Sequence, residues 1–214
     1  MKNIVLIGDS IRMGYDKYVK EALAGVANVY YPPENCRFAE YVLRYAHEWK
    51  KNGEWPTDVD LVHWNAGLWD ALMLFDDEPL TTLDYYENAI ARIDKRLRML
   101  FPNAKFIFAT STAVIENKFA KNFKRDNRVI QKYNETAKRA LANTDTIIND
   151  LFALTSNCPE SYHSDAVHYR TPEGTEVIGG RVLALICREL GISAKDVDIE
   201  NFEPEKYTAD NIGF

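Results

Sequence analysis

Three residues of this chain have the types and the order that nucleophilic catalysis requires. Ser10 follows the first apolar run, Ile4–Ile7, while Asp165 and His168 belong to the late tetrapeptide Asp165-Ala166-Val167-His168. A serine hydroxyl becomes an effective nucleophile when a histidine takes its proton, and a carboxylate on the other ring nitrogen fixes the histidine tautomer. Such a triad is defined by geometry rather than by chain order. We therefore predict Ser10 as nucleophile, His168 as general base and Asp165 as the residue that orients it.

Each of these motifs also has an ordinary structural explanation. A Gly-Asp-Ser sequence after a strand frequently forms a turn and a helix N-cap. His163 stands close to His168 and is the alternative base, but His168 is favoured by its spacing from Asp165. His63 lies inside an apolar run, where a packed and hydrogen-bonded histidine is the expected role.

The rest of the sequence supplies elements that can position these residues. Short apolar runs alternate with longer segments of helical periodicity, a pattern that predicts parallel strands joined by right-handed helical crossovers. The expected fold class is α/β, a flavodoxin-like three-layer α/β/α sandwich around a parallel sheet of about five strands. The predicted strands are Ile4–Ile7, Asn28–Tyr31, Val59–Trp64, Lys105–Thr110 and Thr146–Asn149. The predicted helices are Ile11–Ala24, Arg37–Lys50, Leu83–Leu100, Lys124–Ala142 and Pro172–Leu190.

In an open parallel sheet, ligands bind at the carboxyl ends of the strands. Ser10 follows the first strand, and Asn65 to Asp70 follow the third. The Asp165–His168 tetrapeptide precedes the last helix. We expect these three segments to converge at one edge of the sheet.

Length and charge limit the organisation and the class of protein. The 214 residues fit one domain, 1–193, followed by a polar surface arm, 194–214. A net charge of −6 argues against a nucleic-acid partner. The apolar runs are too short to cross a membrane. The N-terminal run resembles a strand rather than a signal peptide. Cys36, Cys158 and Cys187 have no paired spacing, so we expect no disulfide framework, no zinc site and reduced thiols in a cytoplasmic protein. We expect no cofactor.

The motifs resemble those of the SGNH hydrolases, also called the GDSL esterase family. The sequence from Ile4 to Ser10 is similar to the family's first block, and Asp165 to His168 resembles its last. The resemblance implies a Ser-His-Asp mechanism without a metal. It also implies ester substrates such as acetylated sugars, lipids, thioesters and small aryl esters. Among these we expect short acyl or acetyl esters of small molecules or carbohydrates.

Two of the family's oxyanion donors have no clear counterpart. The third block reads Gly-x-Asn-Asp, whereas this chain has Gly67-Leu68-Trp69-Asp70, so Trp69 occupies the asparagine position. Asn65 is the candidate substitute. No glycine matches the second block, and a backbone N–H of Cys36 or Arg37 is the candidate donor there, with Asn35 as a helix cap. The alternative function is therefore a ligand-binding protein of the same fold with weak or no catalysis.

Other residues near these motifs have both a functional and an ordinary structural explanation. Arg12 follows the nucleophile and is a candidate for substrate contact, although a surface helix arginine is commoner. The segment 72–82 is a candidate cover for the site. A phosphate-binding domain is disfavoured because no Walker lysine follows the first glycine. The basic residues at the start of the fourth predicted helix are interpreted as a solvated face: Lys121, Lys124, Arg125 and Arg128.

Overall fold

A computed structural model describes residues 1–204, 206–208 and 211. Part of the predicted arm, residues 205, 209–210 and 212–214, lies outside the described residues. The elements in chain order are β1 (Lys2–Ile7), α1 (Ser10–Ala22), β2 (Ala27–Tyr30), α2 (Ala39–Asn52), β3 (Leu61–Trp64), β4 (Met73–Leu74), α3 (Leu83–Leu100), β5 (Lys105–Ala109), η1 (Glu116–Lys118), β6 (Phe123–Lys124), α4 (Asn127–Leu141), β7 (Ile147–Asn149), α5 (Leu151–Thr155), η2 (Glu160–Tyr162) and α6 (Pro172–Leu190).

The central sheet has five parallel strands in the order β2-β1-β3-β5-β7. Strand β1 lies between two neighbours, and Ile4 to Ile7 are completely buried. A strand covered on both faces reads as a continuous apolar run, which is why this segment is recognisable in the sequence. The predicted fold class is confirmed, including a strand order of the flavodoxin type.

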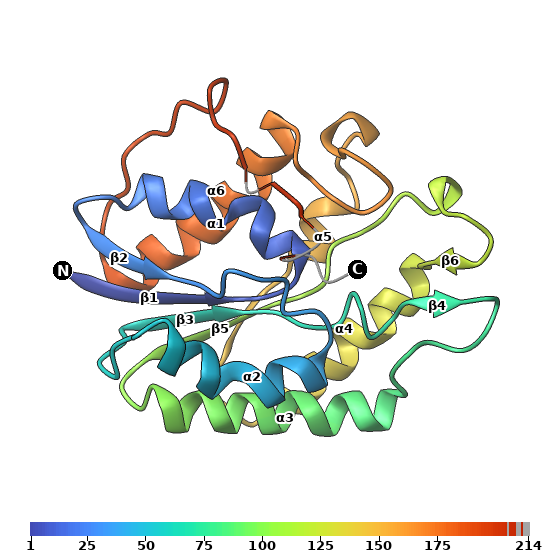
Figure 1. Cartoon of the computed structure of the whole chain (residues 1–214), viewed down its shortest axis with the longest axis horizontal. Helices are drawn as coiled ribbons and strands as arrows, with labels where there is room; N and C mark the ends of the chain where they lie inside the picture. Colours follow the sequence, from blue (N-terminus) through green and yellow to red (C-terminus); the bar gives the residue numbers. More distant parts are fainter. Residues whose placement is uncertain (205, 209–210, 212–214) are drawn as a thin grey trace.

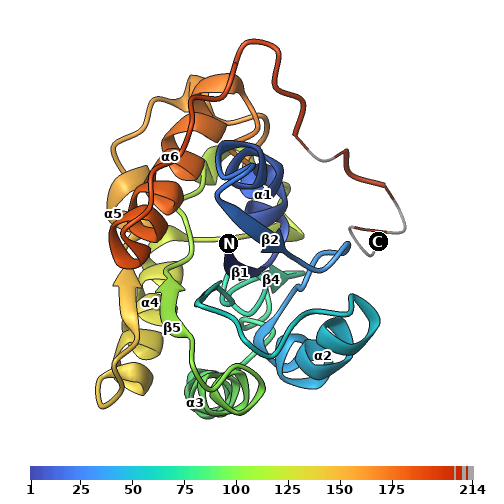
Figure 2. The same ribbon diagram turned by 90° about the vertical axis from the view of Figure 1, so that its left-hand side faces the viewer.

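Helices cover both faces of the sheet, as Figures 1 and 2 show. Helices α1 and α6 pack together on one face, while α3 packs between α2 and α4 on the other. Because all five strands are parallel, their carboxyl ends lie at the same edge. The loops after β1, β2 and β3 therefore meet there, which places the predicted site at one rim of the sandwich.

Helix α2 begins two residues later than predicted and is capped differently. The Asn35 side chain accepts from the Arg37 N–H at 2.9 Å, and Arg37 has a φ of 50°, which is outside helical geometry. The first N–H of the helix, at Ala39, instead donates to the carboxylate of Asp70, which is completely buried. The cap of α2 thus comes from the loop after β3, and Asn35 is not the helix cap.

The fourth predicted helix also begins later, at Asn127. Asp126 caps it by accepting from the Arg128 and Val129 N–H groups. Residues 123–124 form β6, which pairs antiparallel with β4 in a two-stranded ribbon. This ribbon and the one-turn helix α5 were not predicted, because segments of two to five residues carry too little periodicity.

The chain after α6 returns along α1. The Lys195 N–H donates to the Ala22 carbonyl at 2.9 Å, and the Phe202 ring meets Tyr18 edge-on. Figure 2 shows this segment passing around the outside of α1. No helix in the described part of the chain has the length and apolar character needed to cross a membrane.

Candidate active site

Ser10 lies at the junction of β1 and α1, where it begins the helix. Asp9 is the N-cap residue, and its Oδ1 accepts from the Ile11 N–H at 3.0 Å. Gly8 allows the neighbouring strand end to approach closely, since a Cβ at this position would stand 1.9 Å from Asn65 Oδ1. The serine is 3% exposed and stands at the positive end of the α1 dipole.

The structure brings the three predicted triad residues together in series. His168 Nε2 lies 2.8 Å from Ser10 Oγ, and His168 Nδ1 lies 2.7 Å from Asp165 Oδ2. The other carboxylate oxygen of Asp165 accepts from the N–H groups of Val167 and His168 at 2.7 and 2.9 Å. The tetrapeptide is therefore a turn whose own backbone fixes the carboxylate against the imidazole.

This environment stabilises the ionised form of Asp165. Partial burial opposes ionisation, but the hydrogen bond and charge of His168, with the two backbone donors, hold the pKa of Asp165 well below its usual value. The carboxylate thus stays ionised across the neutral range. Because the carboxylate accepts a hydrogen bond from Nδ1–H, the neutral imidazole carries its lone pair on Nε2, which faces the serine hydroxyl.

The other histidines have structural positions. The His163 ring stacks on Tyr169 with centroids 3.9 Å apart, and no hydrogen bond joins it to Ser10 among the described residues. His63 is completely buried between Tyr15 and Asn149, which confirms its predicted packed role. Burial lowers the pKa of His63 to about 3, so this ring stays neutral.

The loop after β3 supplies the remaining predicted site residues. Asn65 is 6% exposed, its N–H extends the β1–β3 pairing at Ile7, and its side chain packs against Gly8. Gly67 has a φ of 139°, and a Cβ there would approach the Tyr86 hydroxyl to 2.7 Å. The side chain of Trp69 is partly exposed. The Asn65 side chain therefore lies directly beside the Gly8–Ser10 turn.

The loop after β2 does not provide the donor expected from the sequence. The Cys36 N–H donates to the Gly8 carbonyl at 3.2 Å, and the Arg37 N–H is taken by Asn35. Both donors are engaged inside the protein, so the structure does not support Cys36 or Arg37 in an oxyanion hole. Cys36 is completely buried, and burial raises the pKa of its thiol to about 11.

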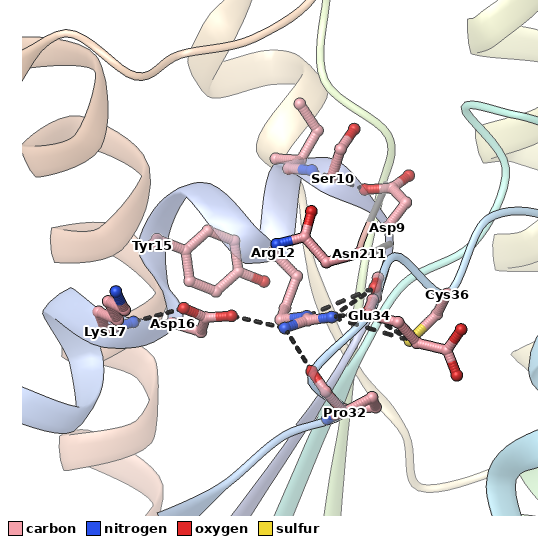
Figure 3. Close-up of polar contacts among 12 residues, drawn as sticks. Asp9, Ser10, Arg12, Tyr15, Asp16, Lys17, Pro32, Glu34, Cys36 and Asn211 are labelled. Carbon is pink, nitrogen blue, oxygen red and sulfur yellow. Dashed lines mark hydrogen bonds and ion pairs between the residues drawn. The ribbon is translucent and has the colours of Figure 1, made fainter. Parts of the chain in front are cut away.

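Arg12 holds this loop rather than a substrate. Its guanidinium forms an ion pair with Asp16 and donates to the Pro32 and Glu34 carbonyls, as Figure 3 shows. The side chain is 1% exposed, so the predicted surface or substrate-binding role is wrong. The contacts tie the start of α1 to the loop after β2, next to Ser10.

Arg125 also departs from the prediction. It was assigned to a solvated basic face, yet it is only 5% exposed. Its Nε donates to the Leu68 carbonyl at 2.7 Å, and its guanidinium lies 5.9 Å from the centre of the Trp69 ring. Burial lowers the pKa of Arg125 to about 10, while Asp9 and Asp165 act in the opposite direction. Sequence reasoning missed this residue because its neighbours Lys124 and Arg128 are surface residues.

Tyr207 joins the site from the far end of the chain. Its hydroxyl donates to the Ser10 carbonyl at 2.7 Å, and its ring meets His168 edge-on at 5.0 Å. The Arg170 guanidinium lies over the same ring, with 3.8 Å between the guanidinium carbon and the ring centre. No sequence motif marks this tyrosine.

The described residues contain no group of three or more His, Cys, Asp or Glu side chains that could hold a metal ion. The side chains that the structure brings together at this edge of the sheet are a serine hydroxyl, an imidazole, carboxylates and a buried guanidinium. This set is suited to acyl transfer through a serine nucleophile.

The fold of this chain is similar to that of several solved structures. The sequence matches no protein family model and no curated protein. Among solved structures, it is similar to a lipase/acylhydrolase from Enterococcus faecalis, with a TM-score of 0.68 and 18% identity over 92% of this chain and 100% of that one. A carbohydrate esterase family 3 protein from Talaromyces cellulolyticus has a TM-score of 0.66 and 16% identity over 90% and 100%. A GDSL-like lipase from Bacteroides thetaiotaomicron has a TM-score of 0.60 and 17% identity over 87% and 88%. The chain thus has the fold of the SGNH, or GDSL-type, hydrolases.

Proposed function

We propose that this protein is a serine esterase that hydrolyses carboxylic esters of small molecules, including short acyl or acetyl esters of carbohydrates. The observation that carries the proposal is the hydrogen-bonded series from Ser10 through His168 to Asp165, with distances of 2.8 and 2.7 Å. The esterases and acylhydrolases among the structures of the same fold support the same reaction type. Neither a metal nor another cofactor takes part in this proposal.

The distances among these residues support the following steps. His168 removes the hydroxyl proton as Ser10 Oγ attacks the ester carbonyl, and the same imidazolium then protonates the leaving alcohol. Water repeats the sequence on the acyl-enzyme and releases the acid. The Ser10 N–H at the start of α1 and the Asn65 side-chain amide are the proposed donors to the oxyanion, each of which is typically worth about 10²–10³ in turnover.

The test is intact-mass analysis after incubation with a fluorophosphonate, which modifies activated serines. The wild-type protein should gain one adduct, and Ser10→Ala should gain none while keeping the wild-type circular dichroism spectrum. Hydrolysis of 4-nitrophenyl acetate should disappear with the same substitution. A folded wild-type protein without an adduct would contradict the proposal.

The second candidate is a ligand-binding protein of this fold with little or no catalysis. It is favoured by one observation, the tryptophan at position 69 where the family motif has its oxyanion asparagine. This candidate predicts that the wild-type protein neither reacts with the fluorophosphonate nor hydrolyses 4-nitrophenyl acetate, so the same experiment separates the two functions.

A further inference from the structure

Arg125 is a buried cation that forms no ion pair with any of the described residues. It lies between β6 and α4 with 5% of its surface exposed. Its Nε donates to the Leu68 carbonyl, but among the described residues no carboxylate lies within ion-pair distance and no acceptor meets the terminal nitrogens. Buried charges in proteins are normally paired or held in several hydrogen bonds, so this arrangement is unusual.

Arg12 provides the comparison within the same chain. It is equally inaccessible, at 1% exposed, but it forms an ion pair with Asp16 and donates to backbone carbonyls at Pro32 and Glu34. Its donors are thus used inside the fold. The two arginines therefore differ in how many of their N–H groups have an acceptor among the described residues. The terminal N–H groups of Arg125 have none there and can donate to a ligand.

The position of Arg125 relates it to the candidate active site. Leu68 and Trp69, which its guanidinium contacts, follow Asn65 in the loop after β3. Asn65 itself packs against Gly8, two residues before Ser10. The guanidinium also interacts electrostatically with Asp9 and Asp165, which flank the serine and the histidine.

Neither of these aspartates is a dedicated counter-ion for Arg125. Asp9 is completely buried, and burial raises its pKa, although the Ile11 N–H and the Asn65 side chain lower it. Asp165 has both oxygens committed to His168 and to backbone N–H groups. A negative charge brought by a ligand would therefore find a donor pair without displacing an existing salt bridge.

We propose that Arg125 binds a carboxylate carried by the ester substrate, which makes it a specificity-determining residue. A planar guanidinium offers two parallel N–H donors that match the two oxygens of a carboxylate. The preferred substrate is then an ester that bears a second, free carboxyl group, on either its acyl or its alcohol side. This inference rests on the esterase function proposed above and names its substrate class.

The test compares charged and neutral esters of similar size in wild type and Arg125→Gln. On the acyl side the pair is mono-4-nitrophenyl succinate and 4-nitrophenyl butyrate; on the alcohol side it is 4-acetoxybenzoate and phenyl acetate. In one pair the substitution should lower kcat/KM for the charged ester by on the order of 10- to 100-fold, the range for a charge-assisted hydrogen bond. The neutral ester should change by less than about threefold.

The matched control is Arg128→Gln. Arg128 is three positions further along, with a side chain that is 89% exposed. The Arg128→Gln substitution should leave kcat/KM unchanged for both the charged and the neutral ester of each pair. Equal losses for charged and neutral esters in Arg125→Gln, or no loss in either pair, would overturn the proposal.

Two further measurements keep the inference testable if a variant or a reaction fails. Should Arg125→Gln not fold, the wild-type protein should still prefer one charged ester, and added salt should reduce that preference; absence of any preference overturns the proposal. Should the wild-type protein hydrolyse no ester, the esterase function fails by itself. Succinate or 4-hydroxybenzoate should then still raise the melting temperature of the wild-type protein. Neither should raise that of Arg125→Lys, which keeps the positive charge but lacks the two parallel N–H donors. An unchanged melting temperature in the wild-type protein would overturn the carboxylate site.

Discussion

The Tyr207 hydroxyl donates a hydrogen bond to the carbonyl oxygen of Ser10 across 197 positions of sequence. The same tyrosine places its ring edge-on to His168. One side chain near the end of the described chain therefore contacts both of the residues proposed to exchange a proton. This relation links the C-terminal segment to the geometry of the site.

Tyr207→Phe should keep the ring contact and lose only the hydrogen bond. A single neutral hydrogen bond contributes about 1 kcal/mol, so kcat/KM for 4-nitrophenyl acetate should fall by roughly fivefold or less. In Tyr207→Ala the value of kcat/KM should fall further, because His168 also loses the aromatic ring that contacts it. Wild-type kinetics in the alanine variant would show that this segment does not act on the site.

The choice between the two nearby histidines gives a clear kinetic contrast. His168→Ala should reduce ester hydrolysis by at least about 10³-fold, because the base in contact with Ser10 is removed. His163→Ala should lose stability through its contact with Tyr169 but change kcat by less than about threefold. Steady-state kinetics together with melting temperatures separate the two effects, and the reverse pattern would move the base to His163.

The loop after β3 offers two candidates for the oxyanion side of the site. Asn65→Ala should lower kcat by about 10²-fold with little change in KM, the effect of removing a donor used in the transition state. Trp69→Phe preserves an aromatic surface beside Arg125 and should cost less than about threefold. A larger loss in the tryptophan variant would identify its indole N–H as the donor instead.

Asp70 makes the folding stability depend on pH. Burial raises the pKa of Asp70 to about 7 despite the hydrogen bond from the Ala39 N–H. Between its ordinary value of 3.8 and about 7 the folded state holds a proton that the unfolded state releases, so stability falls as pH rises through this window. The full effect is on the order of 4 kcal/mol.

Asp70→Asn removes this titration while keeping an oxygen for the Ala39 N–H. Urea unfolding at pH 4.5 and 7.5 should show that the wild-type protein loses more free energy of unfolding over this interval than the variant does. Equal losses in the two proteins would mean that Asp70 is already ionised in the folded state at the lower pH.

The sequence was sufficient to predict the sheet, its five strands and the convergence of three segments at one edge. Buried parallel strands such as Ile4–Ile7 are continuous apolar runs, and α3 has strong helical periodicity. Both kinds of element can therefore be recognised from local sequence alone. The positions of Ser10, His168 and Asp165 follow from the same topology. Their proximity in the structure agrees with that expectation.

What the sequence did not reveal depends on tertiary contacts. Arg12 and Arg125 resemble surface arginines in the sequence, and only the packing of the loops after β2 and β3 buries them. The cap of α2 comes from Asp70, which is 31 positions away, and local propensity cannot identify such a partner. Tyr207 lies in a polar segment without periodicity, and no local pattern indicates that it reaches Ser10.

The placement of these residues along the chain has a consequence during synthesis. Ser10 and its helix emerge from the ribosome first, whereas His168 follows 158 positions later and Tyr207 later still. The nascent chain therefore carries Ser10 without its proposed base until the segment with His168 has been synthesised. We expect hydrolytic activity to appear only after the segment with His168 has left the exit tunnel and packed beside Ser10, as a single event rather than a gradual gain.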